Sequence, residues 1–527
     1  MKKIISLILA VVLTFTLTSC ELLKKAPEVD PTADNYRVFY QIFVGSFSDS
    51  NGDGIGDLRG IINRLDYLND GDINSGDDLG VQGIWLSPIF SSPSYHKYDT
   101  TDYYKIDWRF GTEEDLKELI DKCHERNVKV ILDLVINHTS KNNEWFTKFV
   151  EARQNNDTEN EYYDFYSCVP LSERKNGIAY SSIPNSNGMC YECNFSTEMP
   201  ELNFDNEAVR QRVLEVAKYY LDLGVDGFRF DAIKYIYFGD TKASSDFWAW
   251  YMEELKKIKP DIYCVGECWS ADNETLEYIE ALNCFNFQMA QGEGVIATAA
   301  KGGIVSKFTN YVESYQDRVQ EANAEGFMIP FIANHDMDRA AGYLPLSNGR
   351  AHMAANMYLL CSGSPFIYYG EEIGLKGSRG SANTDANRRL AMLWGDEDRI
   401  KDPTGTTFDA TKQTNGTVLS QQEDETSLLN RYKQLIALRI KYPEIARGEY
   451  TSVSFDETKF GGFKVDYQGS TLGIFHNTVQ REIVIDLSTC HQDLGYNFTK
   501  LCEVIGEGAK LEGTTLTISG QTSVILK

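Results

Sequence analysis

The stretch Gly227-Phe228-Arg229-Phe230-Asp231 decides how this chain is expected to fold. In a β-strand its side chains alternate, so the two phenylalanines point to one face and Arg229 and Asp231 to the other. The apolar face suits packing against helices, whereas buried charges persist only when they are paired or functional. The stretch therefore predicts a strand of a parallel sheet whose interior face ends in a charged pair. The alternative is a purely structural Arg–Asp ion pair.

Similar apolar stretches recur on both sides of this strand. They cover residues 38–43, 81–86, 128–136, 262–266, 327–333 and 365–369. Helical patterns lie between them, including an apolar stripe from Leu58 to Leu68 and a helix that starts after Thr112 as N-cap and continues to Arg126. Alternating strands and helices over this length predict an α/β fold with a closed (β/α)8 barrel.

Two regions depart from this rhythm. Residues 139–203 are polar and rich in Asn, Ser and Tyr, and no helical period appears before Glu207. This region therefore predicts a small domain inserted after the third strand. After about Tyr442 short alternating runs predict a C-terminal antiparallel β-sandwich domain. The expected division is a catalytic barrel over 36–138 and 204–445, the inserted domain over 139–203 and the β domain over 446–527.

The N-terminus has the pattern of an export signal. Lys2 and Lys3 precede an apolar run over residues 4–17, which is too short to span a bilayer comfortably. The run ends in Leu17-Thr18-Ser19-Cys20, which resembles a bacterial lipobox. We therefore expect a signal peptide over 1–19, lipidation of Cys20 and a tether over 20–35 that holds an exported protein on a bacterial membrane, at the cell surface or in the periplasm. The alternative is an ordinary signal with a chance cysteine.

The net charge limits the partners. Asp and Glu outnumber Lys and Arg by 77 to 51, which gives a formal charge of -26. A surface this negative repels nucleic acid and anionic lipid, so we expect no nucleic-acid partner and contact with the membrane only through the N-terminal lipid. A neutral sugar is indifferent to this charge. The sequence carries no indication of the oligomeric state.

Ten cysteines remain after Cys20. Export permits disulfides, and the spacing makes Cys490 with Cys502, or Cys168 with Cys190 or Cys193, plausible pairs. Cys190-x-x-Cys193 lacks a second ligand pair at zinc-finger spacing, so no zinc site is expected.

Polar residues also end three other predicted strands. Glu267 follows residues 262–266, Asp336 follows 327–333 in Asn334-His335-Asp336, and His138 ends the run that begins at Val128. The carboxyl ends of barrel strands meet at one rim, where barrel enzymes carry out their chemistry. Taken alone, Glu267 reads equally well as a surface residue of a loop. Four polar endings at one rim predict an active site.

Two carboxyl groups at one rim suit glycoside hydrolysis. The retaining reaction needs a carboxylate nucleophile and a protonated carboxyl group, with the two about 5–5.5 Å apart. Arg229 favours the charged form of Asp231, so Asp231 is the expected nucleophile. Glu267 has fewer evident cationic neighbours and is the expected acid/base. Asp336 would orient sugar hydroxyls and favour the oxocarbenium-like transition state.

The chain resembles the α-amylase family, glycoside hydrolase family 13, from about Tyr36 to the C-terminus. The segments that carry the resemblance are 133–138, 227–231, 266–267 and 334–336. It implies the same roles for the three acids and makes Tyr98 a stacking platform for the attacked glucose. The substrate-binding residues that it implies are His96, Tyr98, His138, Arg229, Lys234, His335 and Arg339.

A nine-residue segment, Asp49-Ser50-Asn51-Gly52-Asp53-Gly54-Ile55-Gly56-Asp57, places oxygen-bearing side chains at alternate positions with glycines at the turns. It predicts one structural Ca²⁺ held by Asp49, Asn51, Asp53, the Ile55 carbonyl and Asp57; the alternative is a flexible Asp/Gly turn. Gly60 replaces the bidentate glutamate of an EF-hand. The resemblance also includes such a loop after the first strand.

The family resemblance includes a second calcium site between the barrel and the inserted domain. Asn137 matches one of its ligands and Glu201 substitutes for another. Tyr235 stands where many family amylases carry a histidine that offers its carbonyl, which weakens the expectation of a second ion.

The resemblance favours one substrate class. Ala232, Tyr95 and Lys234 match α-1,4-cleaving amylases better than α-1,6-cleaving or exo-acting relatives, so we expect endo-hydrolysis of starch-type glucans and malto-oligosaccharides. The alternatives are an α-glucosidase or a cyclomaltodextrinase/neopullulanase acting on short oligosaccharides, and a non-catalytic surface glucan-binding protein. The presence of all three acids argues against the last of these.

Overall fold

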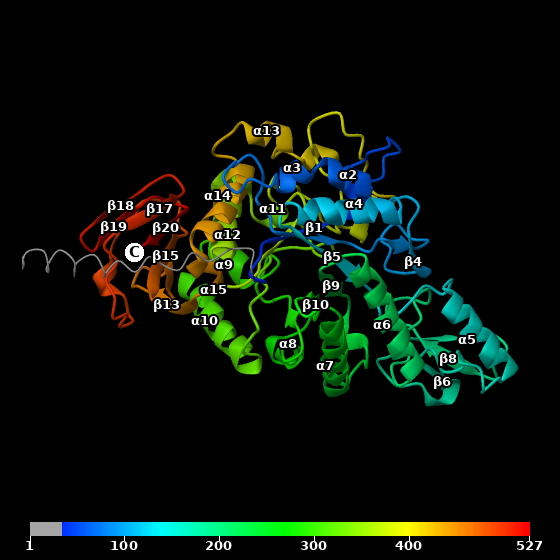
Figure 1. Ribbon diagram of the computed structural model, residues 1–527. Coiled ribbons are helices and arrows are strands. Elements are labelled where there is room, and N and C mark those ends of the chain that lie inside the picture. Colours follow the sequence, from blue (N-terminus) through cyan, green and yellow to red (C-terminus); the bar gives the residue numbers. More distant parts are fainter. Residues whose placement is uncertain (1–33) are drawn as a thin grey trace, which may run out of the picture.

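The computed structural model describes residues 34–527, in which a curled parallel sheet is surrounded by helices and followed by a β domain (Figure 1). The predicted signal peptide, Cys20 and most of the predicted tether lie outside these residues. None of the helices within residues 34–527 is long and apolar enough to cross a membrane.

The parallel sheet has the strand order β11-β10-β9-β5-β2-β1-β12. Its strands are β1 (Phe39–Ile42), β2 (Gly83–Leu86), β5 (Lys129–Leu134), β9 (Gly227–Phe230), β10 (Tyr263–Gly266), β11 (Asn283–Cys284) and β12 (Phe366–Tyr368). Six of them fall inside stretches predicted from the sequence. Two-residue β11 was not predicted, because so short a strand leaves no readable alternation.

Residues 327–333 close the barrel between β11 and β12 without forming a regular strand. The Asn286 amide donates to the Ile329 carbonyl (3.1 Å), and on the other side the Phe366 amide donates to the Pro330 carbonyl (3.0 Å). Pro330 has no N–H to donate, so the hydrogen-bond ladder is interrupted there. The predicted strand is thus an extended segment bonded on both sides, and the predicted (β/α)8 barrel is confirmed.

Helices cover the outside of the barrel (Figure 1). They are α2 (Leu58–Asn63), α3 (Leu65–Leu68), α4 (Glu113–His124), α6 (Glu207–Asp222), α7 (Thr241–Ile258), α8 (Asp272–Ile279), α9 (Val295–Ala300), α10 (Val305–Ala322), α11 (Ala340–Tyr343), α12 (Arg350–Leu359), α13 (Val418–Gln422), α14 (Leu428–Lys441) and α15 (Pro443–Arg447). Thr112 caps α4 in a reciprocal capping box with Asp115, as its sequence position predicted. The predicted helix over residues 58–68 is divided in two at Arg64.

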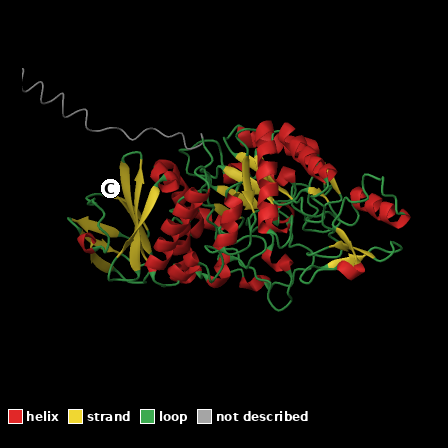
Figure 2. Cartoon of the chain, turned by 90° about the horizontal axis from the view of Figure 1, so that it is seen from below, coloured by secondary structure: helices red, strands yellow, loops and turns green. Residues whose placement is uncertain are grey.

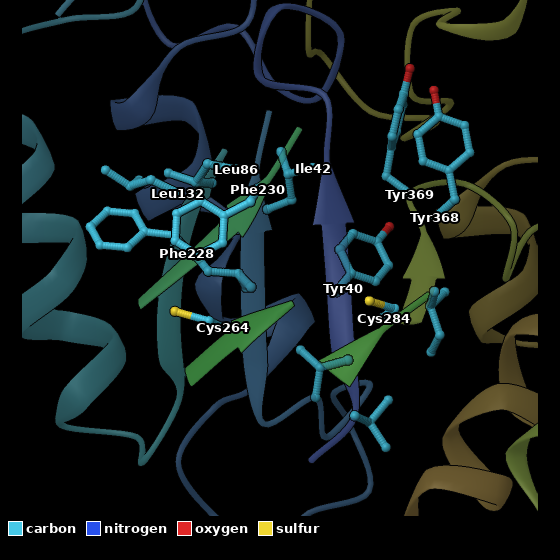
Figure 3. Close-up of a cluster of buried hydrophobic side chains, with 14 of the residues drawn as sticks. Tyr40, Ile42, Leu86, Leu132, Phe228, Phe230, Cys264, Cys284, Tyr368 and Tyr369 are labelled. Atoms are coloured by element: carbon cyan, nitrogen blue, oxygen red, sulfur yellow. The ribbon is translucent and has the colours of Figure 1, made fainter. Parts of the chain in front are cut away.

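The alternation within β9 works as its sequence predicted. Phe228 and Phe230 point outward into the apolar layer between sheet and helices, which Figure 3 shows together with Leu86 and Leu132 of neighbouring strands. The ring of Phe230 lies 4.8 Å from that of Trp248 on α7. The opposite face therefore carries Arg229 and, just past the strand, Asp231 into the barrel.

Residues 139–203 contain α5 (Glu144–Asn155) and an antiparallel sheet of β6 (Cys168–Pro170), β8 (Met189–Glu192) and β7 (Tyr180–Ser182). The short hairpin of β3 (Phe90–Ser91) and β4 (Asp102–Ile106) lies on the same side of the barrel (Figure 1).

The expected disulfides are absent, and all ten cysteines between residues 34 and 527 are free thiols. Cys168 pairs with Tyr191, whereas Cys190 pairs with Val169. This one-residue offset directs the two sulfurs to opposite faces of the sheet. Cys490 and Cys502 are also free, and each thiol contacts the backbone carbonyl of a residue two positions away.

The C-terminal part forms two antiparallel sheets at the end of the molecule opposite the inserted sheet (Figure 2). The larger has the order β13 (Glu449–Ser454), β14 (Phe460–Tyr467), β15 (Ser470–Asn477), β20 (Thr522–Leu526) and β17 (Leu501–Ile505). The smaller consists of β16 (Ile483–Asp486), β19 (Thr515–Ile518) and β18 (Ala509–Glu512).

Candidate active site

Arg229 is the centre of a carboxylate cluster at the rim of the barrel. Its side chain is fully buried, and Nη1 donates to Asp133 Oδ1 (2.8 Å) and to Asp231 Oδ1 (2.7 Å). Nη2 lies 2.9 Å from Glu267 Oε2. The register places Asp133 and Val265 on either side of Arg229, so adjacent strands deliver these acids to one guanidinium. The predicted nucleophile and acid/base therefore lie side by side.

Glu267 is held in a state that suits a proton donor. Burial raises the pKa of Glu267 to about 8, and the negative charges of Asp231 and Asp336 act in the same direction. The Ala232 amide donates to Glu267 Oε2 (3.1 Å) and fixes the carboxyl group. The expectation that Glu267 has few cationic neighbours is wrong, because Arg229 touches it. The contact between Arg229 Nη2 and Glu267 is misaligned for a hydrogen bond. Its lowering effect on the pKa of Glu267 is smaller than the raising effect of burial.

Asp336 has the opposite electrostatic setting. His335 Nε2 lies 3.0 Å from its Oδ2, and Arg389 Nη2 donates to its Oδ1 (2.6 Å). Burial alone would raise the pKa of Asp336, but the contacts with His335 and Arg389 hold it well below its usual range. The carboxylate of Asp336 is thus favoured in its charged form, whereas the raised pKa of Glu267 favours its protonated form at neutral pH.

Tyr98 forms a flat wall beside the acids. Its ring stacks on that of His335 with centroids 5.4 Å apart and an interplanar angle of 3°. Its hydroxyl donates to Asp133 Oδ2 (2.9 Å), and His138 Nε2 lies 3.2 Å from its backbone carbonyl. Burial lowers the pKa of both histidines, so they are neutral hydrogen-bonding groups at neutral pH.

A cavity of about 560 Å³ opens above these groups. It is lined by Tyr95, His96, Tyr98, His138, Phe195, Ser196, Met199, Asp231, Glu267, Trp269, Asp336, Asn383, Thr384, Asp385 and Arg389. The predicted acids and three of the predicted substrate contacts, His96, Tyr98 and His138, thus share one cavity. Arg229 and His335 are buried among its lining residues.

Two predicted substrate contacts lie elsewhere. Lys234 is outside the lining and donates from Nζ to the Trp269 carbonyl (2.8 Å). Arg339 is buried below the rim, where its guanidinium donates to the carbonyls of Tyr369 (2.6 Å) and Arg388 (2.9 Å). This placement does not match the prediction that Arg339 contacts substrate. The guanidinium in the cavity belongs to Arg389.

Sequence reasoning missed several residues of the candidate site. Asp133 could have been noticed as a single acid inside an apolar strand. It accepts hydrogen bonds from Arg229 and Tyr98 and thereby positions both side chains. Arg389 and Phe195 come from irregular loops, where no periodicity marks a residue. Trp269 follows Glu267 by two positions but is not part of a strand.

The predicted calcium loop has suitable donors in a different arrangement. Asp49 Oδ1 accepts from the amides of Asn51 (3.1 Å) and Gly52 (2.7 Å), and its Oδ2 accepts from Gly54. Asp57 is engaged in hydrogen bonds: its Oδ1 caps α2 by accepting from the Gly60 amide, and its Oδ2 accepts from Ser50. Within residues 34–527 no three acidic, His or Cys side chains gather closely enough to hold a metal ion. The oxygen donors fit Ca²⁺ in chemistry, and in this structure the carboxylates of Asp49 and Asp57 accept hydrogen bonds from the loop itself.

The second candidate calcium site is occupied by hydrogen bonds. Glu201 Oε1 accepts from the Asn194 amide (2.9 Å) and Oε2 from Asn194 Nδ2 (3.0 Å). Burial raises the pKa of Glu201 to about 7. The buried Asn137 side chain also contacts Glu201. These residues satisfy one another and do not fit a metal site.

Comparison with known proteins gives consistent results. The family described as "Alpha amylase, catalytic domain" matches residues 41–448. Alpha-amylase 3 of Dictyoglomus thermophilum is 36% identical over 84% of each chain, and oligo-1,6-glucosidase of Bacillus cereus is 30% identical over 88% of this chain and 93% of its own. The solved structure of Eubacterium rectale Amy13B superposes with a TM-score of 0.85 at 35% identity, covering 94% of this chain and 96% of the other.

Proposed function

The chain belongs to the α-amylase family of glycoside hydrolases, and from this premise we propose that it hydrolyses α-1,4-glucosidic bonds in starch-type glucans and malto-oligosaccharides with retention of anomeric configuration. The observation that supports this most strongly is the contact of Arg229 with both Asp231 and Glu267. One guanidinium that touches two carboxyl groups holds them close to each other at the rim of the barrel. That proximity is what the retaining reaction requires.

The chemistry follows from the charges. Asp231 attacks the anomeric carbon while Glu267 gives its proton to the leaving oxygen, so the glycosidic bond breaks as a glycosyl ester forms. Glu267, now ionised, takes a proton from water, and that water cleaves the ester and restores Asp231. Asp336 stabilises the positive charge that develops on the sugar, and Tyr98 stacks on the ring.

Product analysis tests this function. Incubation with amylose, pullulan and maltose should release a range of malto-oligosaccharides from amylose first, each with the α-configuration in the earliest NMR spectra. Early products in the β-configuration would contradict the two-step mechanism. An α-glucosidase or cyclomaltodextrinase would instead prefer short oligosaccharides, which the similarity to an oligo-1,6-glucosidase keeps as the second candidate.

We also propose that residues 49–57 bind one structural Ca²⁺, on the strength of the alternating oxygen ligands and of Gly52 and Gly54, whose positive φ angles let the loop turn. Removal of Ca²⁺ with EDTA should lower Tm by about 3 °C, since a ligand at a hundred times its Kd stabilises by about 2.7 kcal/mol. Asp53→Ala should abolish the response, whereas Asp409→Ala, at an exposed carboxylate elsewhere, should keep it. Equal Tm values with and without Ca²⁺ for the unmodified protein would refute the site.

For localisation we propose export and lipid anchoring through Cys20, which the lipobox-like segment 17–20 supports. Cells fed labelled palmitate should label the protein and carry it in the membrane fraction. Cys20→Ser should lose the label and the membrane association while starch hydrolysis is retained. Label in the serine variant would contradict the anchor.

A further inference from the structure

Lys97 has an unusual backbone conformation beside the active-site cavity. Its φ angle is 68°, in the left-handed region that residues other than glycine rarely adopt. Its neighbours His96 and Tyr98 both line the cavity, with ring centroids 6.1 Å apart. A strained backbone persists only where the surrounding structure holds it, so the contacts around Lys97 must maintain this turn.

The ammonium group of Lys97 is buried and fully bonded. The side chain is 2% exposed, and its Nζ lies 2.9 Å from Asp107 Oδ2. Nζ also donates to the backbone carbonyls of Ser94 (2.7 Å) and Ser92 (3.3 Å). These three acceptors use all the N–H donors of an ammonium group, so none of them is left for a substrate. The charge of Lys97 therefore ties its own loop together.

The partner carboxylate of Asp107 is fixed as well. Asp107 directly follows β4, and Arg109 donates to both of its oxygens, from Nε to Oδ1 (2.8 Å) and from Nη2 to Oδ2 (3.0 Å). Arg109 Nη2 also donates to the Ser92 carbonyl (2.9 Å). Burial raises the pKa of Asp107, but the hydrogen bonds from Arg109 and Lys97 outweigh burial and leave this pKa below its usual value. Lys97 thus anchors the turn to a charged and immobile group.

The same turn sets the positions of the two cavity side chains. The Lys97 amide donates to Ser94 Oγ (3.1 Å), and the Tyr98 amide donates to His96 Nδ1 (3.2 Å). At its other end the Tyr98 side chain donates from its hydroxyl to Asp133 Oδ2 (2.9 Å). A change of φ at residue 97 would rotate the chain between His96 and Tyr98 and break these contacts.

We propose that Lys97 is a positioning residue whose ammonium group holds the left-handed turn that directs His96 and Tyr98 into the cavity. This inference rests on the proposed glucan hydrolysis, in which Tyr98 stacks on the attacked glucose. The contacts of Nζ with Asp107 and the two serine carbonyls offset the cost of the strained backbone. Lys97 acts through its neighbours and does not touch the substrate.

Two substitutions at position 97 separate the turn from the charge. Lys97→Met keeps an apolar stem and the strained backbone without the ammonium group, so the turn should open. Its kcat/KM for maltopentaose should fall roughly 100-fold, because misplacing a binding group by about 1 Å can cost that much. Lys97→Gly also lacks the ammonium group, but glycine adopts the left-handed conformation without strain, so the loss should be at most roughly ten-fold.

Thermal stability should follow the opposite order. Lys97→Gly loses the whole buried stem of the lysine, so its Tm should be lower than that of Lys97→Met. A lysine with a merely structural role would give the same order in stability and in activity. Equal losses of kcat/KM in the two variants would overturn the positioning role.

A double-mutant cycle tests whether Lys97 acts through Tyr98. In a Tyr98→Ala background, Lys97→Met should lower kcat/KM by less than roughly three-fold, because the ring that it positions is already absent. Arg447→Met is the matched control, since it removes another buried cation, 5% exposed and 2.7 Å from Asp34, before β1 at the opposite end of the barrel. It should lower Tm and leave kcat/KM unchanged. Independent, multiplying losses for Lys97→Met and Tyr98→Ala would overturn the proposal.

A crystal structure of Lys97→Met gives a readout that needs no activity. The φ angle at residue 97 should become negative, and the Tyr98 hydroxyl should leave Asp133. A methionine variant that keeps the turn and the Tyr98 contact would overturn the role of Lys97 alone. A wild-type enzyme that cleaves no α-glucan would overturn the proposed function, whereas the position of Tyr98 in the variant would still decide whether Lys97 holds the turn.

Discussion

Asp231→Asn should lower kcat on maltopentaose by at least roughly 10⁴-fold, because removing the nucleophile of a covalent mechanism abolishes the step on which turnover depends. An amide has nearly the same shape as a carboxylate, so substrate binding should change little and KM should stay within a few-fold. The loss should therefore appear almost entirely in kcat, measured by release of reducing ends under saturating substrate.

Replacing Asp231 with a smaller residue identifies the face from which the anomeric carbon is attacked. Asp231→Ala leaves space where azide can enter, and with an activated α-glycosyl substrate the azide should take the place of the carboxylate. The product should be the β-glycosyl azide, because attack comes from the side opposite the leaving group. Asp133→Asn is the matched control, since it disturbs the same guanidinium without removing the nucleophile. Azide rescue in Asp133→Asn, or normal turnover by Asp231→Asn, would contradict the assignment.

The positions of the three acids followed from the sequence because parallel strands carry their last residues to one rim. The alternation in residues 227–231 separated outward phenylalanines from inward charges, and the same logic placed Glu267 after β10. These are local rules that depend only on strand geometry. For that reason the barrel and the placement of the three acids at its rim were predictable without any knowledge of contacts between distant residues.

Other features depend on contacts that a local pattern does not contain. Arg389 reaches Asp336 from a loop 53 residues away, and Arg339, which family resemblance suggested, turns instead toward carbonyls under the rim. The barrel closes at Pro330, where the missing N–H hides an extended segment from strand assignment. The pairing of cysteines likewise depends on the register between β6 and β8, which spacing along the chain does not determine.

The shared guanidinium also changes the argument for the catalytic roles. Because Arg229 touches both carboxyl groups, its positive charge alone does not distinguish Asp231 from Glu267. What distinguishes Glu267 is its burial between two other acids, which raises its pKa to about 8. The role of proton donor therefore rests on desolvation and on neighbouring negative charge, as in other carboxyl groups kept neutral at neutral pH.

Glu267→Gln should lower kcat/KM on malto-oligosaccharides by roughly 10³-fold, a typical contribution of general acid catalysis. With α-maltosyl fluoride the loss should be much smaller, because fluoride leaves without a proton. In the wild type, activity on oligosaccharides needs the protonated carboxyl group and should fall as pH rises through about 8. Equal losses on the two substrates would show that Glu267 is not the proton donor.

The same substitution has a predictable effect on stability. The folded state holds the Glu267 proton up to about pH 8, whereas an unfolded glutamate releases it near its ordinary value of 4.5. The folded protein thus binds more protons between these values, and its free energy of unfolding should decrease as pH rises through that window. Glutamine does not titrate, so Tm of Glu267→Gln should decline less between pH 5 and 9 than that of the wild type. A parallel decline in both proteins would mean that Glu267 is already ionised at neutral pH, and the acid of the reaction would have to be sought elsewhere.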